Sequence, residues 1–164
     1  DIDPSYYTLL IEHAIETKAI DLVDIELFVE EDKIQHLLTT AKENGVYVVM
    51  SNHDFKKTPS KEEIIKRLCK MQEYGADIPK IAVMPNSVGD VLTLLDATYT
   101  MKKDYADRPI ITMSMAGTGV LSRLAGEVFG SDCTFAAGKE ASAPGQIPVE
   151  ELRLVMEVLH KRMY

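Results

Sequence analysis

The stretch LVDIELF, residues 22–28, decides between the folds open to this sequence. Its length and its β-branched and aromatic content predict a strand. Because successive side chains of a strand point to opposite faces, Asp24, Glu26 and Phe28 share one face, and the other face is entirely aliphatic. Strands that helices cover on both sides are usually apolar on both faces. This strand therefore predicts a sheet with helices on one face and a polar space on the other.

Outward from this strand, strand-like and helical segments alternate along the whole chain. Strands are predicted near residues 22–28, 46–51, 78–84, 109–115 and 133–137, with helical segments before, between and after them. Repeated strand–helix units imply parallel strands joined by helical crossovers. Two architectures satisfy this order, an open doubly wound sheet and a (β/α)8 TIM barrel.

Polar side chains on the later strands favour the barrel. The second strand runs into the polar residues 51–54, the third carries Lys80, and the fourth carries Thr112 and Ser114 on one face. We expect these groups to gather in a polar lumen. No GxGxxG motif follows a strand, which argues against a dinucleotide-binding sheet. We therefore predict an α/β fold of the TIM-barrel type in a single domain over residues 1–164, with the small-residue loop 138–147 as a lid.

The composition argues against several classes of protein. Of 164 residues, 46% are hydrophobic, which argues against disorder, and no apolar run approaches the length of a membrane helix. A formal charge of −8 has the wrong sign for a nucleic-acid surface. Cys69 and Cys133 suit a reducing compartment, and the sequence shows no zinc-ligand spacing. We expect a cytoplasmic protein that binds neither nucleic acid nor membrane and holds no metal.

Lys80 carries the strongest chemical signal. It stands between Pro79 and the apolar run 81–84, where an unpaired ammonium group is costly to bury. One interpretation is a structural lysine with a buried partner. The other is an amine that burial keeps neutral, so that it attacks a carbonyl carbon and forms a Schiff base. His53, within the polar run 51–54, has the ordinary interpretation of a turn residue beside that of a site residue.

Two loops have the composition of ligand-binding segments. Residues 115–119, MAGTG, lie between a strand and a helix, where backbone N–H groups can hold an anion, and Arg123 follows close behind to pair with a carboxylate. Residues 141–146, ASAPGQ, combine small residues with polar ends, as a closing loop does.

Five stretches taken together resemble type I 3-dehydroquinate dehydratases. They occur in the order and spacing of that family, and the resemblance covers essentially all 164 residues. The stretches are DIELF (24–28), MSNHDF (50–55), DIPKIA (77–82), SRLAGEVFG (122–130) and ASAPGQ (141–146).

The resemblance implies a TIM-barrel lyase that works through an imine. Lys80 would form the Schiff base with the C3 ketone of 3-dehydroquinate. His53 would remove the C2 proton as general base and then protonate the departing C1 hydroxyl. Glu26 would hold and polarise His53. These steps give syn loss of water and 3-dehydroshikimate, a reaction of the shikimate pathway and of aromatic amino acid biosynthesis.

The resemblance also implies the remaining site residues and the partners. Arg123 would bind the substrate carboxylate, and Ser142 and Gln146 would close over the substrate hydroxyls from the lid. No metal or organic cofactor would be needed. The family resemblance further implies a homodimer in the cytoplasm.

The sequence departs from the family in two ways. It matches from the helix before the fourth barrel strand onward, so we expect a partial barrel of about five βα units that lacks the first three strands. The start at Asp1, without an initiator Met, fits a truncated chain, for which we expect little or no activity alone. Gly117 stands where relatives often carry Lys. Two alternatives stay open, another class I Schiff-base lyase or aldolase and a non-catalytic barrel fragment.

Overall fold

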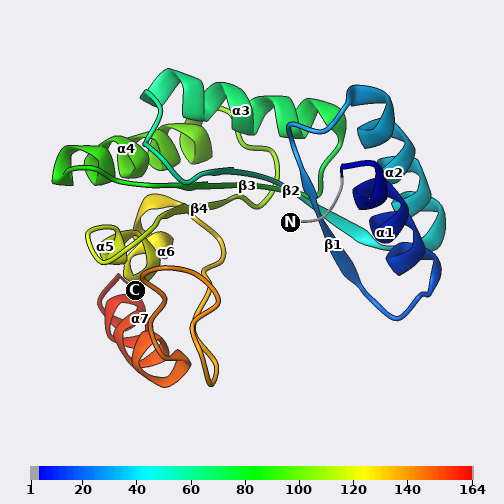
Figure 1. Cartoon of the computed structure of the whole chain (residues 1–164). Helices are drawn as coiled ribbons and strands as arrows, with labels where there is room; N and C mark the ends of the chain where they lie inside the picture. The colour runs from blue at the N-terminus through cyan, green and yellow to red at the C-terminus, as the bar shows by residue number, and fades with distance from the viewer. Residues whose placement is uncertain (1–3, 164) are drawn as a thin grey trace.

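A computed structural model describes residues 4–163 (Figure 1). The order of elements is α1 (Pro4–Glu16), β1 (Leu22–Glu26), α2 (Glu31–Asn44), β2 (Tyr47–Asp54), α3 (Lys61–Tyr74), β3 (Ile78–Val83), α4 (Val88–Asp104), β4 (Ile111–Ser114), α5 (Val120–Leu124), α6 (Gly126–Phe129) and α7 (Val149–Met163). Local chemistry explains several boundaries. Ser60 caps α3 by accepting from the Glu63 amide, and the left-handed Gly45 and Gly75 end α2 and α3.

The strands form one parallel sheet in the order β1-β2-β3-β4. This arrangement confirms the α/β class with parallel strands and helical crossovers. The helices α1 to α4 each contact the strand that follows or precedes them, while α5, α6 and α7 gather at the β4 end of the sheet (Figure 1). No helix among residues 4–163 combines the length and the apolar character needed to span a membrane.

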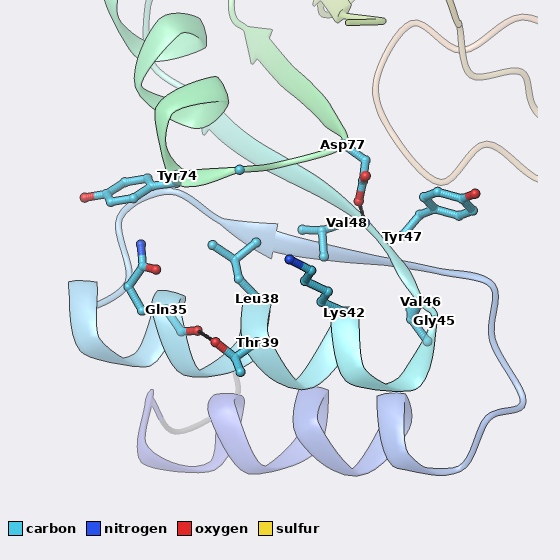
Figure 2. A pocket seen from close by; sticks show the side chains of 11 residues that line it. Gln35, Leu38, Thr39, Lys42, Gly45, Val46, Tyr47, Val48, Tyr74 and Asp77 are labelled. Carbon is cyan, nitrogen blue, oxygen red and sulfur yellow. Dashed lines mark hydrogen bonds between the residues drawn. The ribbon is translucent and has the colours of Figure 1, made fainter.

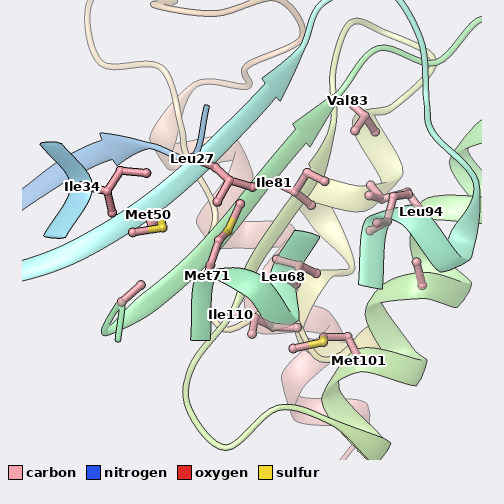
Figure 3. Close-up of a cluster of buried hydrophobic side chains, with 13 residues drawn as sticks. Leu27, Ile34, Met50, Leu68, Met71, Ile81, Val83, Leu94, Met101 and Ile110 are labelled. Atoms are coloured by element: carbon pink, nitrogen blue, oxygen red, sulfur yellow. The ribbon is translucent and has the colours of Figure 1, made fainter. Parts of the chain in front are cut away.

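The main core lies between the sheet and the helices that cover its outer face (Figure 3). Met50 of β2 and Ile81 of β3 point into it, and the alternation along each strand sends their neighbours Ser51 and Lys80 to the inner face. Full burial of such a side chain contributes about 1.5–3 kcal/mol, so this outer layer fixes the register that places the inner residues. The fully buried members include Ile34, Ile64, Leu68, Met71, Leu94, Met101 and Ile110.

The polar inner face belongs to β1, β2 and β3, and the prediction that the polar residues of the fourth strand join it is wrong. Thr112 points outward, where its hydroxyl lies 2.7 Å from the Thr98 hydroxyl of α4. The Ser114 amide donates to the Ser122 hydroxyl at 2.8 Å. Register sets Met113 beside Ala82, so β4 contributes an apolar surface to the inner face.

The prediction of a fifth strand over residues 133–137 is also wrong. Residues 133–136 are irregular, and Ala137 makes only an isolated bridge to Pro148. The preceding residues do bond to the β4 side, and the Asp132 amide donates to the Ile110 carbonyl at 2.8 Å. The next amides on the β4 side use side chains instead: the Thr112 amide donates to Ser131 Oγ at 3.0 Å, and the Ile110 amide donates to Asp132 Oδ2 at 2.8 Å. These side-chain acceptors replace the backbone acceptors that a strand ladder requires.

Candidate active site

The carboxyl ends of β1 and β2 bring an acid and an imidazole together. Glu26 ends β1, and His53 is the penultimate residue of β2. A hydrogen bond joins His53 Nδ1 to Glu26 Oε1. Because a carboxylate accepts, this hydrogen bond requires a proton on Nδ1, which leaves Nε2 as the nitrogen that can accept a proton when the ring is neutral. Phe55 stacks on the imidazole with ring centroids 5.8 Å apart, which adds a second contact that restricts the orientation of the ring.

Lys80 is buried on the inner face of β3, with 8% of its surface exposed. Its Nζ donates to Asp24 Oδ2 at 2.7 Å and lies 5.1 Å from the centroid of the Phe135 ring. Asp24 Oδ1 also accepts a hydrogen bond from the Ser51 hydroxyl. The partner that burial of an ammonium requires is therefore Asp24, two residues before Glu26 on the same face of β1.

The register explains how Lys80 and His53 share a site although Lys80 comes early in its strand. Lys80 pairs with Ser51 and Ala82 pairs with His53, so His53 lies two residues farther toward the carboxyl end. Two residues of a strand span about 7 Å, which the four-carbon stem of a lysine can bridge. Both side chains line the same cavity.

Arg123 of α5 is a buried cation. Only 1% of its surface is exposed, and its acceptors are Met113 Sδ at 3.6 Å, the Phe135 carbonyl at 3.4 Å and the Pro144 carbonyl at 3.2 Å. Within the described residues 4–163, its Nε has no hydrogen-bond partner and no ion pair forms to the guanidinium. Burial lowers the pKa of Arg123. A buried guanidinium without a counterion is suited to receiving an anionic ligand.

The loop 138–147 closes one side of the site. Ser142 and Gln146 bond to each other, with the Ser142 amide donating to Gln146 Oε1 at 2.8 Å. The loop rests on the turn after β4, where the Ala116 amide donates to the Pro144 carbonyl at 3.2 Å. Gly145 adopts φ +77°, and a Cβ there would lie 2.3 Å from the Ala116 carbonyl oxygen, so this close approach requires glycine.

These elements enclose a cavity of about 310 Å³. Five of the six predicted site residues line it, and the sixth, Glu26, reaches it through His53. The complete lining is His53, Phe55, Lys80, Ala82, Met113, Met115, Arg123, Phe135, Ser142, Ala143, Pro144 and Gln146. No group of three His, Cys, Asp or Glu residues in the described part of the chain is arranged to hold a metal ion.

A larger cavity, of about 590 Å³, lies at the opposite, amino end of β2 and β3 against α2 (Figure 2). Its lining includes Lys42, Tyr74 and Asp77, and Asp77 Oδ2 accepts a hydrogen bond from the Val48 amide. The lining contains neither a histidine nor a buried cation, so acid–base and nucleophilic chemistry point to the smaller cavity.

The structure adds groups that the sequence reasoning did not assign. Asp24 stood on the predicted polar face but received no role, whereas Met113 and Phe135 gave no signal, because their place in the lining depends on register and loop path. The expected anion-binding role of residues 115–119 is not supported: the Gly119 and Val120 amides donate to carbonyl oxygens of the same turn.

Comparison with known sequences places the chain among dehydratases. A sequence model of type I 3-dehydroquinase matches residues 1–163. The 3-dehydroquinate dehydratase of Bacillus velezensis is 70% identical over 162 residues, which cover 99% of this chain and 64% of the relative. The Bacillus subtilis 3-dehydroquinate dehydratase is 69% identical over 161 residues, 98% of this chain and 63% of the relative. The chain thus spans somewhat less than two thirds of the length of these relatives.

Solved structures agree with this result. A type I 3-dehydroquinate dehydratase from Clostridium difficile, solved with covalently modified comenic acid, has a TM-score of 0.94 and 56% identity over 99% of this chain and 64% of its own. The 3-dehydroquinate dehydratase from Geobacillus kaustophilus has a TM-score of 0.93 and 43% identity over 98% of this chain and 62% of its own.

Proposed function

The chain belongs to the type I 3-dehydroquinase family, and from this premise we propose that it carries the dehydratase site that converts 3-dehydroquinate to 3-dehydroshikimate. One observation carries the proposal: a buried lysine, a carboxylate-held imidazole and an arginine that forms no ion pair within residues 4–163 line the same cavity. An imine-forming dehydration needs a nucleophilic amine, a general base and an anion-binding group, and each has a candidate here.

The first step is imine formation at Lys80. Its Nζ must transfer a proton before it can attack the C3 ketone, and the Asp24 carboxylate at 2.7 Å is an acceptor in hydrogen-bonding contact. The carbinolamine then loses its oxygen as water and leaves a protonated imine joining C3 to Nζ. The imine draws electrons from the neighbouring carbon and so makes the C2 proton acidic.

The second step is proton transfer by His53. Its Nε2 takes the C2 proton while Glu26, bonded at Nδ1, stabilises the imidazolium that results. The electron pair left at C2 forms the C1–C2 double bond, and Nε2 returns the proton to the departing C1 hydroxyl, which leaves as water. Hydrolysis of the product imine restores Lys80 and releases 3-dehydroshikimate.

The remaining residues bind the substrate. Arg123 pairs with its carboxylate, which supplies the counterion that the buried guanidinium otherwise lacks. Ser142 and Gln146 exchange their mutual hydrogen bonds for bonds to substrate hydroxyls. The overall charge is −8, so capture of an anionic substrate depends on such local cations.

We place this site in a single domain that forms part of a TIM barrel, acting as a cytoplasmic homodimer without a cofactor. Among the described strands β1 pairs only with β2, so its other edge is free for a further strand. We propose that the chain by itself has little turnover, because the part of the relatives that it does not match would complete the lumen.

A fusion tests this proposal. The part of the Bacillus velezensis relative that this chain does not match is joined to the chain, and appearance of the conjugated product from 3-dehydroquinate is followed by ultraviolet absorption. We expect turnover in the fusion and little in the chain alone. A folded fusion that binds 3-dehydroquinate but forms no 3-dehydroshikimate would overturn the assignment.

A further inference from the structure

A second polar cluster lies on the opposite, helix-covered side of the sheet, directly behind the Glu26–His53 pair. Its centre is Arg67 of α3, whose Nη1 donates to Asn52 Oδ1 at 2.8 Å and whose Nε donates to Glu63 Oε1 at 2.7 Å. The Arg67 guanidinium carbon also lies 5.4 Å from the centroid of the Phe28 ring. The Arg67 side chain thus contacts both the segment that follows β1 and the end of β2.

The positions of these partners relate the cluster to the active site. Asn52 precedes His53 on β2, and Phe28 lies two residues beyond Glu26, where β1 has already ended. The prediction that put Phe28 on the polar face with Glu26 is therefore wrong, because the strand alternation stops at Glu26 and the Phe28 ring lies against Arg67. Because side chains alternate along a strand, Asn52 points outward to Arg67 when His53 points inward to Glu26. A shift of either strand end relative to the other would therefore change the separation of the acid and the imidazole.

The chemistry of the cluster suits a fixed link between α3 and the end of β2. Asn52 is 3% exposed, so its carbonyl oxygen needs a donor, and a guanidinium supplies a charged one. Glu63, one helical turn before Arg67 on α3, orients the guanidinium through Nε and leaves Nη1 for Asn52. The planar fork of arginine can serve both acceptors at once, which the single ammonium of lysine cannot do with the same geometry.

We propose that Arg67 is a positioning residue for the Glu26–His53 pair, holding the carboxyl ends of β1 and β2 together from the far side of the sheet. The proposal rests on the proposed function only in that His53 is taken as the general base. The competing explanation is that Arg67 serves α3 packing alone, in which case the state of His53 does not depend on it.

Imidazole nitrogen spectra separate the two explanations. The 164-residue chain is labelled with ¹⁵N-histidine, and long-range ¹H–¹⁵N spectra are recorded without substrate for the parent, R67Q, R67K and R108Q. The control Arg108 also bonds across elements, to the Ala76 carbonyl at 2.6 Å, but at the amino end of β3. We expect a single Nδ1–H tautomer for His53 in the parent and in R108Q.

In R67Q we expect loss of this single-tautomer signature, with His36 and His160 unchanged, and in R67K a partial loss. A folded R67Q chain that keeps the parent His53 spectrum would overturn the proposal, as would an equal change in R108Q. If R67Q does not fold, F28L carries the test, because Phe28 is 69% exposed and its change removes only the ring contact. F28L should shift the His53 signals in the same direction, and an unchanged spectrum there would also overturn it.

Because no substrate is present, these outcomes are independent of whether the fusion forms product. A loss of the His53 signature in R67Q, together with a folded fusion that binds 3-dehydroquinate but forms no product, would support the positioning role of Arg67 and contradict the proposed function. An unchanged His53 spectrum in R67Q together with an active fusion would overturn the positioning role of Arg67 and support the proposed function.

Discussion

The two halves of the cavity differ in how their charges are satisfied. On the β1–β3 side, each charged group has a partner: Glu26 holds His53, and Asp24 holds Lys80. On the side of β4 and the loop 138–147, Arg123 is buried against a thioether and two carbonyl groups. The charged groups of the first half are therefore paired without a ligand, whereas the described residues of the second half supply no anion to Arg123. We propose that the first half carries out the imine and proton-transfer steps and that the second half binds the substrate carboxylate.

Replacement of Lys80 should have the largest effect, because no other group of the cavity can form the imine. We expect K80M to abolish both the turnover of the fusion and the covalent adduct that borohydride reduction of the imine with 3-dehydroquinate would leave. The matched control is K42M, at a lysine of the other cavity, which should retain both. Turnover of K80M within about tenfold of the parent, a difference of only ~1.4 kcal/mol in the barrier, would assign the nucleophile elsewhere.

Loss of the base should come next. We expect H53Q to lower the turnover of the fusion by roughly 10²–10⁴-fold, the usual contribution of a general base. The adduct at Lys80 should still form, since imine formation does not require proton removal from C2. H36Q, at an exposed histidine paired with Glu12, should change neither quantity. An H53Q fusion with parental turnover would leave the β1–β3 half without its proposed base.

Arg123 tests the contrast between the halves most closely. A charged hydrogen-bonded pair contributes about 1.5–3 kcal/mol, so R123M should weaken substrate binding by roughly 10- to 150-fold, measured as KM of the fusion. The same change removes a buried cation for which residues 4–163 supply no counterion, so the free energy of unfolding of R123M should equal or exceed that of the parent.

Denaturant unfolding of R123M and K80M supplies the comparison. K80M leaves the Asp24 carboxylate without its cation and should be less stable than R123M. A large loss of stability in R123M together with none in K80M would contradict the view that Lys80 has its charge partner in the chain and Arg123 does not.

The smallest expected effect concerns Tyr7, which borders the β1–β3 half. Its hydroxyl accepts a hydrogen bond from the Glu26 amide at 3.1 Å. Burial, and then the charges of Asp24 and Glu26, raise the pKa of Tyr7 above its ordinary value of 10.0. The unfolded phenol therefore loses its proton first, and stability falls as the pH rises from about 10 through the raised pKa of the folded state.

Unfolding midpoints on either side of this window check the sign. Y7F should show a shallower fall with pH than the parent, whereas Y6F, at an exposed tyrosine of the same helix, should follow the parent. A parallel fall in Y7F and the parent would remove Tyr7 as the cause.

Predicted residues of both halves line the cavity, but the sequence predicts which strand face points inward better for β1 to β3 than for β4. The alternation in LVDIELF and the charge of Lys80 inside an apolar strand are local signals, so Glu26 and Lys80 could be found without coordinates. The β4 half depends on register. Alternation alone puts Thr112 and Ser114 on one face but leaves open whether that face points inward, and the pairing of Ala82 with Met113 shows that it points outward.

The predicted fifth strand and the position of Phe135 also depend on long-range placement, which the local pattern does not encode. Residues 133–137 have strand-like composition, but beside the backbone bond from Asp132 to Ile110, the side chains of Ser131 and Asp132 accept from the Thr112 and Ile110 amides. Phe135 reaches Lys80 through the path of an irregular segment, which no periodicity encodes. Long-range placement, rather than local propensity, is what the sequence pattern lacked.

Borohydride trapping tests the central claim most directly. The chain and the fusion are incubated with 3-dehydroquinate and reduced with sodium borohydride, and the digested peptides are analysed by mass spectrometry. The account predicts an adduct on the peptide that contains Lys80, present in H53Q, weakened in R123M and absent in K80M. A folded parent fusion without an adduct, or with the adduct on another lysine, would contradict it.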